Sequence, residues 1–296
     1  MLYLCIMNTQ NLNHLKEVLS IPTKTWKEEL MIQYLVDYCL DKGLQCETDD
    51  NGSVYVTKGN TDIFPCVVAH IDTVHEPVEM VVNEEQLPNA QGELKLSLKA
   101  YEKENGNPTG IGGDDKAGVF ICLKMLEQLD NIKAFFPVAE ETGCHGSSDA
   151  DENFFKDVGY AIQFDSTEND TMSLTLMGVK LFEEDSNFFN SVKGIILEHG
   201  LKNWHNHPYT DTMKLKEKFD FSCLNFAAGY YNYHTKDEYV VVDDVQNTCD
   251  MAVKIIDTLG ENKYTYIHKK QLIKEYDWSY SDYEDDYDDD SDDWDY

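Results

Sequence analysis

Five short motifs in the chain carry histidine or acidic side chains that could ligate metal ions and activate water. They are His70-Ile71-Asp72, Gly113-Asp114-Asp115-Lys116, Glu140-Glu141, Phe164-Asp165 and His234. Each falls at the end of an apolar run of the buried-strand kind, or opens a helix just after one. Histidine nitrogen and carboxylate oxygen are the usual zinc ligands where cysteine is absent, and a remaining carboxylate can act as a base. The set predicts a site for a pair of zinc-like ions at one edge of a sheet.

The spacing of His70 and Asp72 has a use in a metal site. If one ring nitrogen of His70 binds an ion, a nearby carboxylate can hold the other nitrogen and fix the tautomer. Asp72 is placed to do so. In isolation, a histidine at a strand end is more often a hydrogen-bonded structural residue, so this motif gains its meaning from the other four.

Asp114 and Asp115 follow two glycines at the expected start of a helix. Acidic residues suit the macrodipole at a helix N-terminus, so a purely structural role is the alternative. In the functional interpretation, the two oxygens of Asp114 span two ions about 3.5–4 Å apart. Glycine at positions 112 and 113 would let the backbone come close to such a site.

The pair Glu140-Glu141 ends an apolar strand, where two adjacent glutamates would normally both enter solvent. Adjacent residues on an extended segment point to opposite sides. One glutamate could therefore bind metal while the other faces the open ligand position as a base, and the residues alone do not decide which does which. Asp165 and His234 would each be discounted singly, but chance rarely produces all five motifs in this order.

The elements that must position these residues alternate between strand and helix. Pro22-Thr23 separates two helices within residues 11–43. The other expected elements are strands at 53–57, 64–69, 134–139 and 160–164, and helices at 114–129, 183–199 and 243–259. This alternation predicts an α/β fold whose sheet is mixed but mostly parallel, with helices on both faces. Residues 76–109 show only weak alternation and look like an excursion from this plan.

Composition limits the partners and the compartment. The formal net charge of −32 argues against nucleic acid or an anionic membrane as a partner, because both would be repelled. Eight cysteines without a CxxC pair are typical of reduced thiols in a cytosolic protein. The opening MLYLCIM lacks the basic start and cleavage site of a signal peptide, and no apolar run approaches a membrane span. We therefore expect a cytoplasmic protein.

The same motifs resemble those of a known family. The matching stretches are VVAHIDTV (67–74), GIGGDDKAGV (110–119), VAEETGCHGS (138–147), IQFDST (162–167) and GYYNYHTKDEYV (229–240). Together they are similar to the co-catalytic di-zinc exopeptidases, the group that holds peptidase T, carboxypeptidase G and the bacterial zinc aminopeptidases. The resemblance spans roughly residues 12–260.

The resemblance implies a role for each matching residue. His70, Asp114 and Asp165 would hold one ion, and Asp114, Glu141 and His234 the other, with Asp114 shared. Glu140 would be the general base and acid, and Asp72 the partner of His70. The implied cofactors are two divalent ions, zinc or alternatively manganese or cobalt.

One departure from the family concerns the segment between Asp165 and His234. Peptidase T and carboxypeptidase G insert a separate dimerisation domain there, whereas only 68 residues, 166–233, intervene in this chain. A domain usually needs at least about 50 residues of its own, so we expect no inserted lid. Any oligomer would then form through the outer surface, with residues 76–109 as one route, and the oligomeric state stays open.

In lid-bearing relatives the lid supplies a histidine that stabilises the oxyanion. Without a lid, no residue of this chain is an obvious candidate for that role. Lidless relatives often use a tyrosine, which makes Tyr230, Tyr231 and Tyr233 candidates, with buried packing as the alternative for each. His205 and His207 beside Trp204 could form another metal or substrate site, although a surface loop is the plainer interpretation. His145, four residues after Glu141, could support the metal ligands.

The chain divides into three expected regions. Residues 1–10 would be an N-terminal extension, 11–270 the di-metal peptidase domain, and 275–296 a disordered acidic tail. The tail holds twelve Asp or Glu residues and no Lys or Arg, which favours disorder. It would act as a solubilising segment, or dock on a basic protein partner, or compete weakly for the protein's own metals.

The predicted function is hydrolysis of amide bonds in short peptides, with an aminopeptidase as the first choice. A carboxypeptidase or an N-acyl-amino-acid deacylase is the alternative enzyme, because the metal ligands do not reveal which end of the substrate is bound. A metal-binding relative without activity, retained as a binding protein, is the alternative outside enzymes. The presence of all five ligands and the base counts against it.

Overall fold

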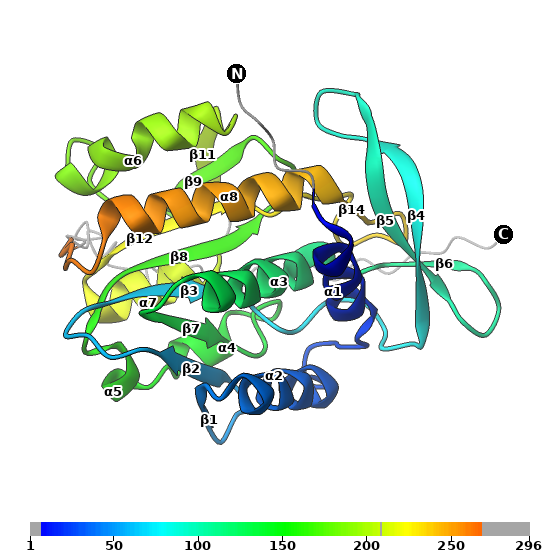
Figure 1. Ribbon diagram of the computed structural model, residues 1–296, viewed down its shortest axis with the longest axis horizontal. Coiled ribbons are helices and arrows are strands. Elements are labelled where there is room, and N and C mark those ends of the chain that lie inside the picture. The colour runs from blue at the N-terminus through cyan, green and yellow to red at the C-terminus, as the bar shows by residue number, and fades with distance from the viewer. Residues whose placement is uncertain (1–6, 208, 268–296) are drawn as a thin grey trace, which may run out of the picture.

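The computed structural model describes residues 7–207 and 209–267 (Figure 1). Its main sheet has nine strands, of which eight form a continuous order and β11 (Asn203–His207) pairs with β9. In spatial order these eight are β1 (Gln45–Thr48), β2 (Val54–Lys58), β7 (Ile132–Phe136), β3 (Phe64–Val68), β8 (Val158–Ser166), β12 (Ser222–Ala227), β9 (Thr171–Leu176) and β10 (Val179–Lys180). The central strands β7, β3, β8 and β12 are parallel neighbours, and the strands toward the edges pair mainly antiparallel.

Helices cover both faces of this sheet. Figure 1 shows α3 (Gly113–Gln128) and α8 (Val242–Leu259) in front of the strands, and α7 (Asp211–Phe219) behind them. The other helices are α1 (Thr9–Ser20), α2 (Glu29–Lys42), α4 (His145–Ser148), α5 (Glu152–Phe155) and α6 (Asn187–Glu198). The predicted α/β fold with a mixed, mostly parallel sheet and helices on both faces is confirmed.

Local sequence signals account for several helix boundaries. Asn8 caps α1 by accepting the N–H of Asn11. Gly43, in the left-handed conformation, ends α2. Helix α1 begins at Thr9, inside the stretch expected as an N-terminal extension.

The central strands are buried along their whole length. Every residue of β3, β7 and β8 is buried, as expected of parallel strands covered on both faces. Because the carboxyl ends of parallel strands meet at one edge of the sheet, the residues that follow these three strands are brought together there. That edge carries His70, Glu140 and Asp165.

A second sheet, which the sequence analysis did not predict, lies beside the first. Its strands are β13 (Tyr230–Tyr231), β14 (Tyr239–Val241), β5 (Leu94–Glu102) and β4 (Met80–Pro88), with β6 (Pro108–Thr109) paired to β5. Residues 76–109, expected as an excursion, therefore form the antiparallel hairpin of β4 and β5, which extends to the right in Figure 1. Within this sheet, the hydroxyl of Tyr239 in β14 donates to the carbonyl of Pro88 at the end of β4, at 2.6 Å.

The segment between Asp165 and His234 builds the main domain instead of a lid. Its described residues form β9, β10, α6, β11, α7, β12 and β13. Residues 203–207, expected as a surface loop, are strand β11 and pair in parallel with β9. The absence of an inserted lid is confirmed for residues 166–207 and 209–233.

Two further observations concern cysteines and membranes. All seven cysteines of the described residues are free thiols, and six of them are buried. Within residues 7–207 and 209–267, no helix has the length and apolar character needed to cross a membrane. The expected acidic tail at 275–296 lies outside the described residues.

Candidate metal centre

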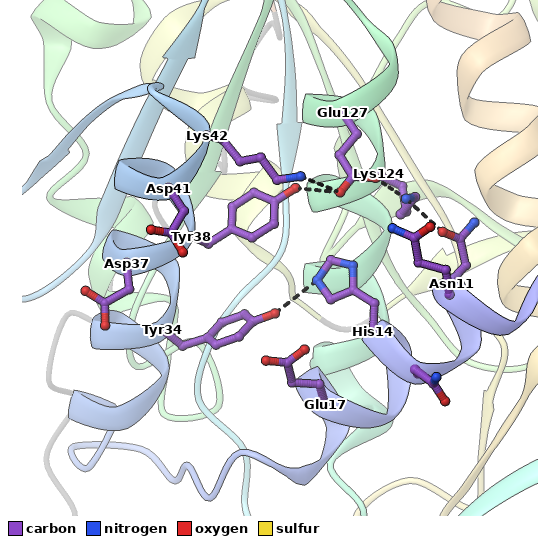
Figure 2. A pocket seen from close by; sticks show the side chains of 12 residues that line it. Asn11, His14, Glu17, Tyr34, Asp37, Tyr38, Asp41, Lys42, Lys124 and Glu127 are labelled. Atoms are coloured by element: carbon purple, nitrogen blue, oxygen red, sulfur yellow. Dashed lines mark hydrogen bonds and ion pairs between the residues drawn. The ribbon is translucent and has the colours of Figure 1, made fainter.

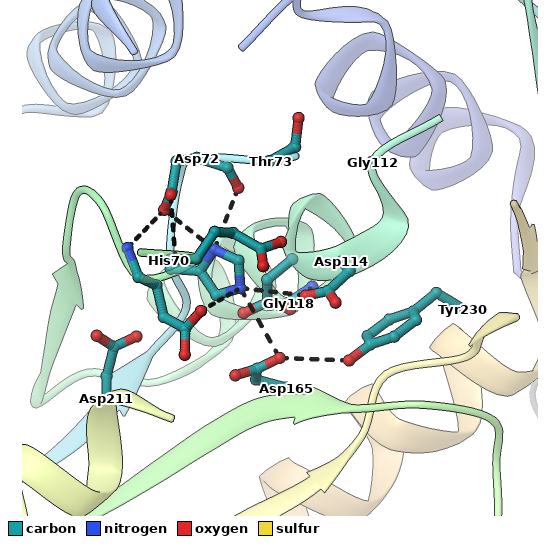
Figure 3. Close-up of polar contacts among 12 residues, drawn as sticks. His70, Asp72, Thr73, Gly112, Asp114, Gly118, Asp165, Asp211 and Tyr230 are labelled. Atoms are coloured by element: carbon teal, nitrogen blue, oxygen red, sulfur yellow. Dashed lines mark hydrogen bonds and ion pairs between the residues drawn. The ribbon is translucent and has the colours of Figure 1, made fainter. Parts of the chain in front are cut away.

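The five motifs converge at the carboxyl edge of the main sheet. His70 follows β3, Glu140 and Glu141 follow β7, and Asp165 is the penultimate residue of β8. Asp114 sits in the first turn of α3, and His234 comes from the loop between β13 and β14. Figure 3 shows His70 at the centre, with Asp114 and Asp165 directed toward its ring.

The structure arranges five of these side chains in two groups that share one member. His70, Asp114 and Asp165 form the first group, and Asp114, Glu141 and His234 the second. Within each group, the potential ligand atoms all lie within 4.8 Å of one another. The resemblance to the di-zinc exopeptidases implied the same two groups, and the role of these residues as ligands stays a prediction.

Asp114 presents a different oxygen to each histidine. Its Oδ1 lies 3.1 Å from Nε2 of His70, and its Oδ2 lies 3.4 Å from Nε2 of His234. Nε2 of His70 is also 3.8 Å from Oδ1 of Asp165, and Nε2 of His234 is 3.0 Å from Oε2 of Glu141. A carboxylate with one oxygen toward each group is the geometry that a bridge between two ions requires.

Glu140 stands outside both groups but next to them. Its Oε2 lies 3.9 Å from Nε2 of His70, and the thiol of Cys144 donates to its Oε1 at 3.5 Å. The side chain is buried, at 5% exposure, yet it lines the cavity of the site. Its neighbour Glu141 points to His234, so the two glutamates diverge as the sequence analysis expected of adjacent residues.

Asp72 connects the histidine to the glutamates. Its Oδ1 lies 3.3 Å from Nδ1 of His70, while its backbone carbonyl is the nearer acceptor, at 3.1 Å. The same carboxylate accepts the N–H of Glu140 at 2.9 Å, the N–H of Glu141 at 3.2 Å and the hydroxyl of Thr25 at 2.8 Å. Asp72 thus does more than the single contact with His70 that the sequence suggested.

The charge of the site fits bound cations. Six carboxylates at or next to the site are buried around one buried imidazole, His70; they belong to Asp72, Asp114, Asp115, Glu140, Asp165 and Asp211. Oδ2 of Asp115 and Oδ1 of Asp211 have no hydrogen-bond partner among the described residues. Since unpaired buried charge is costly, such an excess of oxygen ligands suits divalent ions.

The pKa values of these groups reflect the same excess of negative charge. Burial raises the pKa of Asp165 to about 8 and that of Asp211 to about 6. Burial also raises the pKa of Glu140 well above its usual value. Hydrogen bonds to Asp114 and Glu141 raise the pKa of His234 to about 10. Without cations, therefore, the site retains protons at pH values where these carboxylates would be ionised in water.

Two residues to which the sequence analysis gave no role, Gln163 and Asn225, hold Asp165 in place, and Gln163 also contacts Asp211. Nε2 of Gln163 donates to Oδ2 of Asp165 at 3.3 Å and to Oδ2 of Asp211 at 3.0 Å. Asn225 accepts the N–H of Asp165 and donates to its carbonyl. No sequence signal marks Asp211, because an acidic residue in the first turn of a helix is ordinary.

The site opens into a cavity of about 230 Å³. It is lined by Asp114, Glu140, Glu141, Asp165, Thr167, Tyr209, Thr210, Tyr230, Tyr233 and His234. All four acidic residues of this lining belong to the five motifs, and none of the lining residues is Lys or Arg.

The structure separates the three candidate tyrosines. The hydroxyl of Tyr230 donates to Oδ1 of Asp165 at 3.3 Å, inside the site (Figure 3). The ring of Tyr233 is 4.9 Å from that of His234 and is 44% exposed at the cavity. The hydroxyl of Tyr231 donates instead to Asp244. Tyr230 and Tyr233 stay candidates for oxyanion stabilisation, and Tyr231 does not line the cavity.

Two other histidines that the sequence singled out, His145 and His205, lie outside the site. The ring of His145 packs against that of Trp26, with 5.3 Å between centroids. His205 lies on β11, where its Nδ1 is 3.3 Å from the carbonyl of Asn203. Neither belongs to the two groups of potential metal ligands.

A larger cavity, of about 450 Å³, lies between α1, α2 and α3 (Figure 2). Its polar groups pair with one another: Nε2 of His14 is 3.0 Å from the hydroxyl of Tyr34, and Glu127 accepts from Tyr38 at 3.1 Å. Lys124 forms an ion pair with the same glutamate. The cavity contains none of the five motifs.

Comparison with known proteins shows that solved structures of peptidases share this fold. Neither a protein-family model nor a curated protein matches the sequence. Among solved structures, aminopeptidase PepT from Bacillus cereus superposes with a TM-score of 0.68 at 14% identity, covering 86% of this chain and 99% of that one. A tripeptidase from Staphylococcus aureus gives a TM-score of 0.65 at 14% identity, covering 85% and 98%.

A third similar structure comes from an archaeon. The aminopeptidase from Desulfurococcus kamchatkensis gives a TM-score of 0.61 at 13% identity, covering 85% of this chain and 95% of that one. The chain therefore has the fold of these aminopeptidases and this tripeptidase. At the level of the fold, this confirms the resemblance to di-zinc exopeptidases that the five motifs suggested.

Proposed function

We propose that the protein is a two-metal aminopeptidase that acts on short peptides. The observation that carries the proposal is the position of Asp114, which offers one oxygen to each histidine while Glu140 stays outside both groups. The shared fold with two aminopeptidases and a tripeptidase agrees with peptide hydrolysis.

The ligands that would hold the ions are those of the two groups. His70 and Asp165 would hold the first ion, Glu141 and His234 would hold the second, and Asp114 would contribute to both. Two divalent ions at this position, zinc or alternatively manganese or cobalt, supply Lewis acidity for the scissile carbonyl and lower the pKa of water.

Glu140 is the group that moves the proton. Its carboxylate is buried beside both groups and opens on the cavity, where it accepts a proton from the attacking water. It then passes that proton to the leaving nitrogen as the amide C–N bond breaks. Asp72 holds the backbone of Glu140 and Glu141, so the base keeps its position relative to His70.

Apart from His234, a proposed metal ligand, the cavity lining offers no cationic side chain to hold the carboxyl end of a peptide. A carboxypeptidase must hold a free carboxylate, which Arg and Lys do best. The cavity lining contains neither residue, and the 296-residue chain has no arginine. The four acidic side chains of the lining are the proposed metal ligands Asp114, Glu141 and Asp165 and the proposed base Glu140. Two bound divalent ions would balance their charge, so the choice of the amino end rests on the lack of Lys and Arg in the lining.

Blocked and unblocked tripeptides test the proposal. The protein is loaded with zinc, manganese or cobalt and incubated with a free tripeptide, its N-acetylated form and its C-amidated form, and the products are identified by mass spectrometry. We expect release of the N-terminal residue from the free and the amidated peptide, and none from the acetylated one.

Other products would identify the alternatives. Release of the C-terminal residue would indicate a carboxypeptidase, and cleavage of the acetylated peptide at its acyl group a deacylase. No hydrolysis by protein with both ions bound would leave a metal-binding relative without activity.

A further inference from the structure

Two residues that no motif assigned converge behind the shared ligand Asp114. Glu238 immediately precedes β14 and is fully buried, at 0% exposure. It belongs to the stretch 229–240, in which the sequence analysis gave roles to His234 and to three tyrosines but none to Glu238. His75 follows the His70-Ile71-Asp72 motif, and the sequence gave no indication of its function.

Glu238 accepts three hydrogen bonds with its two carboxylate oxygens. Oε1 accepts the N–H of Asp114 at 3.0 Å. Oε2 accepts the N–H of Gly112 at 2.8 Å and lies 2.7 Å from Nε2 of His75. An ionised carboxylate has acceptors only, so it matches three donors, whereas the amide of glutamine would turn an NH₂ group toward one of them.

The glycines before Asp114 show how closely the chain approaches this pair. A Cβ atom on Gly110 would lie 2.0 Å from the ring of His75. One on Gly113 would lie 2.7 Å from Val240 and 3.4 Å from Oε1 of Glu238. The start of this segment therefore fits against His75 and β14 because positions 110 and 113 are glycine.

The contacts tie together three segments that carry metal ligands. His75 belongs to the segment after β3, which carries His70. Gly112 and Asp114 begin α3. Glu238 lies four residues after His234 in the loop between β13 and β14. The carboxylate of Glu238 thus connects the segments that carry His70 and His234 to the backbone of Asp114.

We propose that Glu238, oriented by His75, is a positioning residue that holds Asp114 between the two metal ions, a role that rests on the proposed two-metal site. The backbone of Asp114 fixes the direction of its carboxylate, which must present one oxygen to each histidine. Loss of the Glu238 contacts would let the start of α3 shift, and both ions would be affected because Asp114 is the only residue in both groups.

Metal affinity separates this role from a merely structural one. Zinc binding is measured by competition with a chromophoric chelator for wild type, Glu238→Gln, His75→Asn and the control Asp244→Asn. Asp244 is also a buried carboxylate that accepts two side-chain hydrogen bonds, from Asn169 and Tyr231, and it belongs to neither metal group. The melting temperature of each metal-free variant is recorded in parallel.

We expect Glu238→Gln to lower the affinity for zinc at both sites by about 10- to 100-fold, the usual effect of losing a residue that supports metal ligands. His75→Asn should weaken both by a smaller factor. Asp244→Asn should bind zinc like wild type even where its melting temperature falls as far. If Glu238→Gln does not fold, His75→Asn still provides the test.

Three results would overturn the positioning role. They are unchanged zinc affinity in Glu238→Gln, unchanged affinity in His75→Asn, and an equal loss of affinity in Asp244→Asn. Wild type that binds two ions but hydrolyses no peptide would refute the proposed activity alone and leave the positioning role standing on affinity. Wild type that binds no zinc would refute both.

Discussion

The backbone N–H of Glu140 donates to Oδ1 of Asp72 at 2.9 Å. The same carboxylate oxygen lies 3.3 Å from Nδ1 of His70. One buried side chain therefore sets the position of the proposed base and the orientation of a proposed metal ligand. Because β3 and β7 are parallel neighbours, the segments after them lie close enough for this contact.

Replacing Asp72 should disturb both functions at once. In Asp72→Asn, the amide can accept only one of the two backbone N–H groups, and it loses the charge that stabilises the His70 ring. We expect zinc affinity to fall by about 10- to 100-fold, and kcat to stay reduced when zinc is saturating. Chelator competition and steady-state kinetics measure the two effects, and a variant with full kcat at saturating zinc would show that Asp72 does not position the base.

Removing the charge of Glu140 should separate metal binding from catalysis. Glutamine has the same shape but cannot accept the proton of water, so we expect Glu140→Gln to bind two ions and lose at least about a hundredfold in kcat. Elemental analysis and a tripeptide assay on the same sample measure both. Substantial remaining activity would place the base elsewhere and overturn the assignment of Glu140 and Glu141.

Replacing the proposed shared ligand, Asp114, should affect zinc binding differently from replacing a ligand of one ion, His234. Asp114→Asn should lower the affinity for zinc at both sites by about a hundredfold or more. The loss of a ligand lowers affinity more than the loss of a residue that only supports a ligand. His234→Ala should chiefly remove the ion held with Glu141. Titration of each apoprotein with zinc counts the remaining sites, and loss of a single site in Asp114→Asn would refute the bridge.

Protons and metal ions should compete for the folded site. The pKa of Asp165 rises from 3.8 to about 8, and that of Asp211 from 3.8 to about 6, because both are buried. Between these limits the folded protein holds protons that the unfolded chain has released, so stability falls as pH rises. His234, with its pKa raised from 6.5 to about 10, acts in the same direction above neutrality.

We therefore expect the melting temperature of metal-free protein to drop by about 5 °C or more between pH 5 and pH 8. Saturating zinc should remove or reverse this slope, because the ions take the place of the protons. Differential scanning calorimetry with and without chelator measures both curves. A metal-free melting temperature that rises across this range would contradict the described burial of Asp165 and Asp211.

The sequence was most informative where apolar runs end in polar residues. The runs before His70, Glu140 and Asp165 are strands β3, β7 and β8, and their parallel arrangement follows from the alternation with helices. The site residues could be predicted because most of them lie at such an end or beside it, whereas their division into two groups came from the resemblance to the di-zinc exopeptidases. Their roles as ligands and base stay predictions that the experiments above address.

Other parts of the fold gave weak signals for physical reasons. Strand β4 reads Met-Val-Val-Asn-Glu-Glu-Gln-Leu-Pro and is mostly exposed, so it lacks the apolar pattern of a core strand. The polar run at 203–207 hides strand β11 in the same way. Glu238 contacts residues 126 and 124 positions away, and no local pattern reports a contact of that kind.

Some expectations concern features that the described residues do not reach. The acidic tail at 275–296 and its docking on a basic partner remain predictions. Because the proposed site lies within residues 7–207 and 209–267, we expect truncation after Lys274 to leave peptide hydrolysis unchanged at saturating metal. A large fall in kcat of the truncated protein would show that the tail contributes to the active fold.

The most direct test of the central claim is an anomalous-scattering map from crystals of the protein grown with zinc. Two peaks about 3.5–4 Å apart are expected, one beside His70 and Asp165 and the other beside Glu141 and His234, with the carboxylate of Asp114 between them. A single peak, or two peaks that do not share Asp114, would contradict the two-metal site.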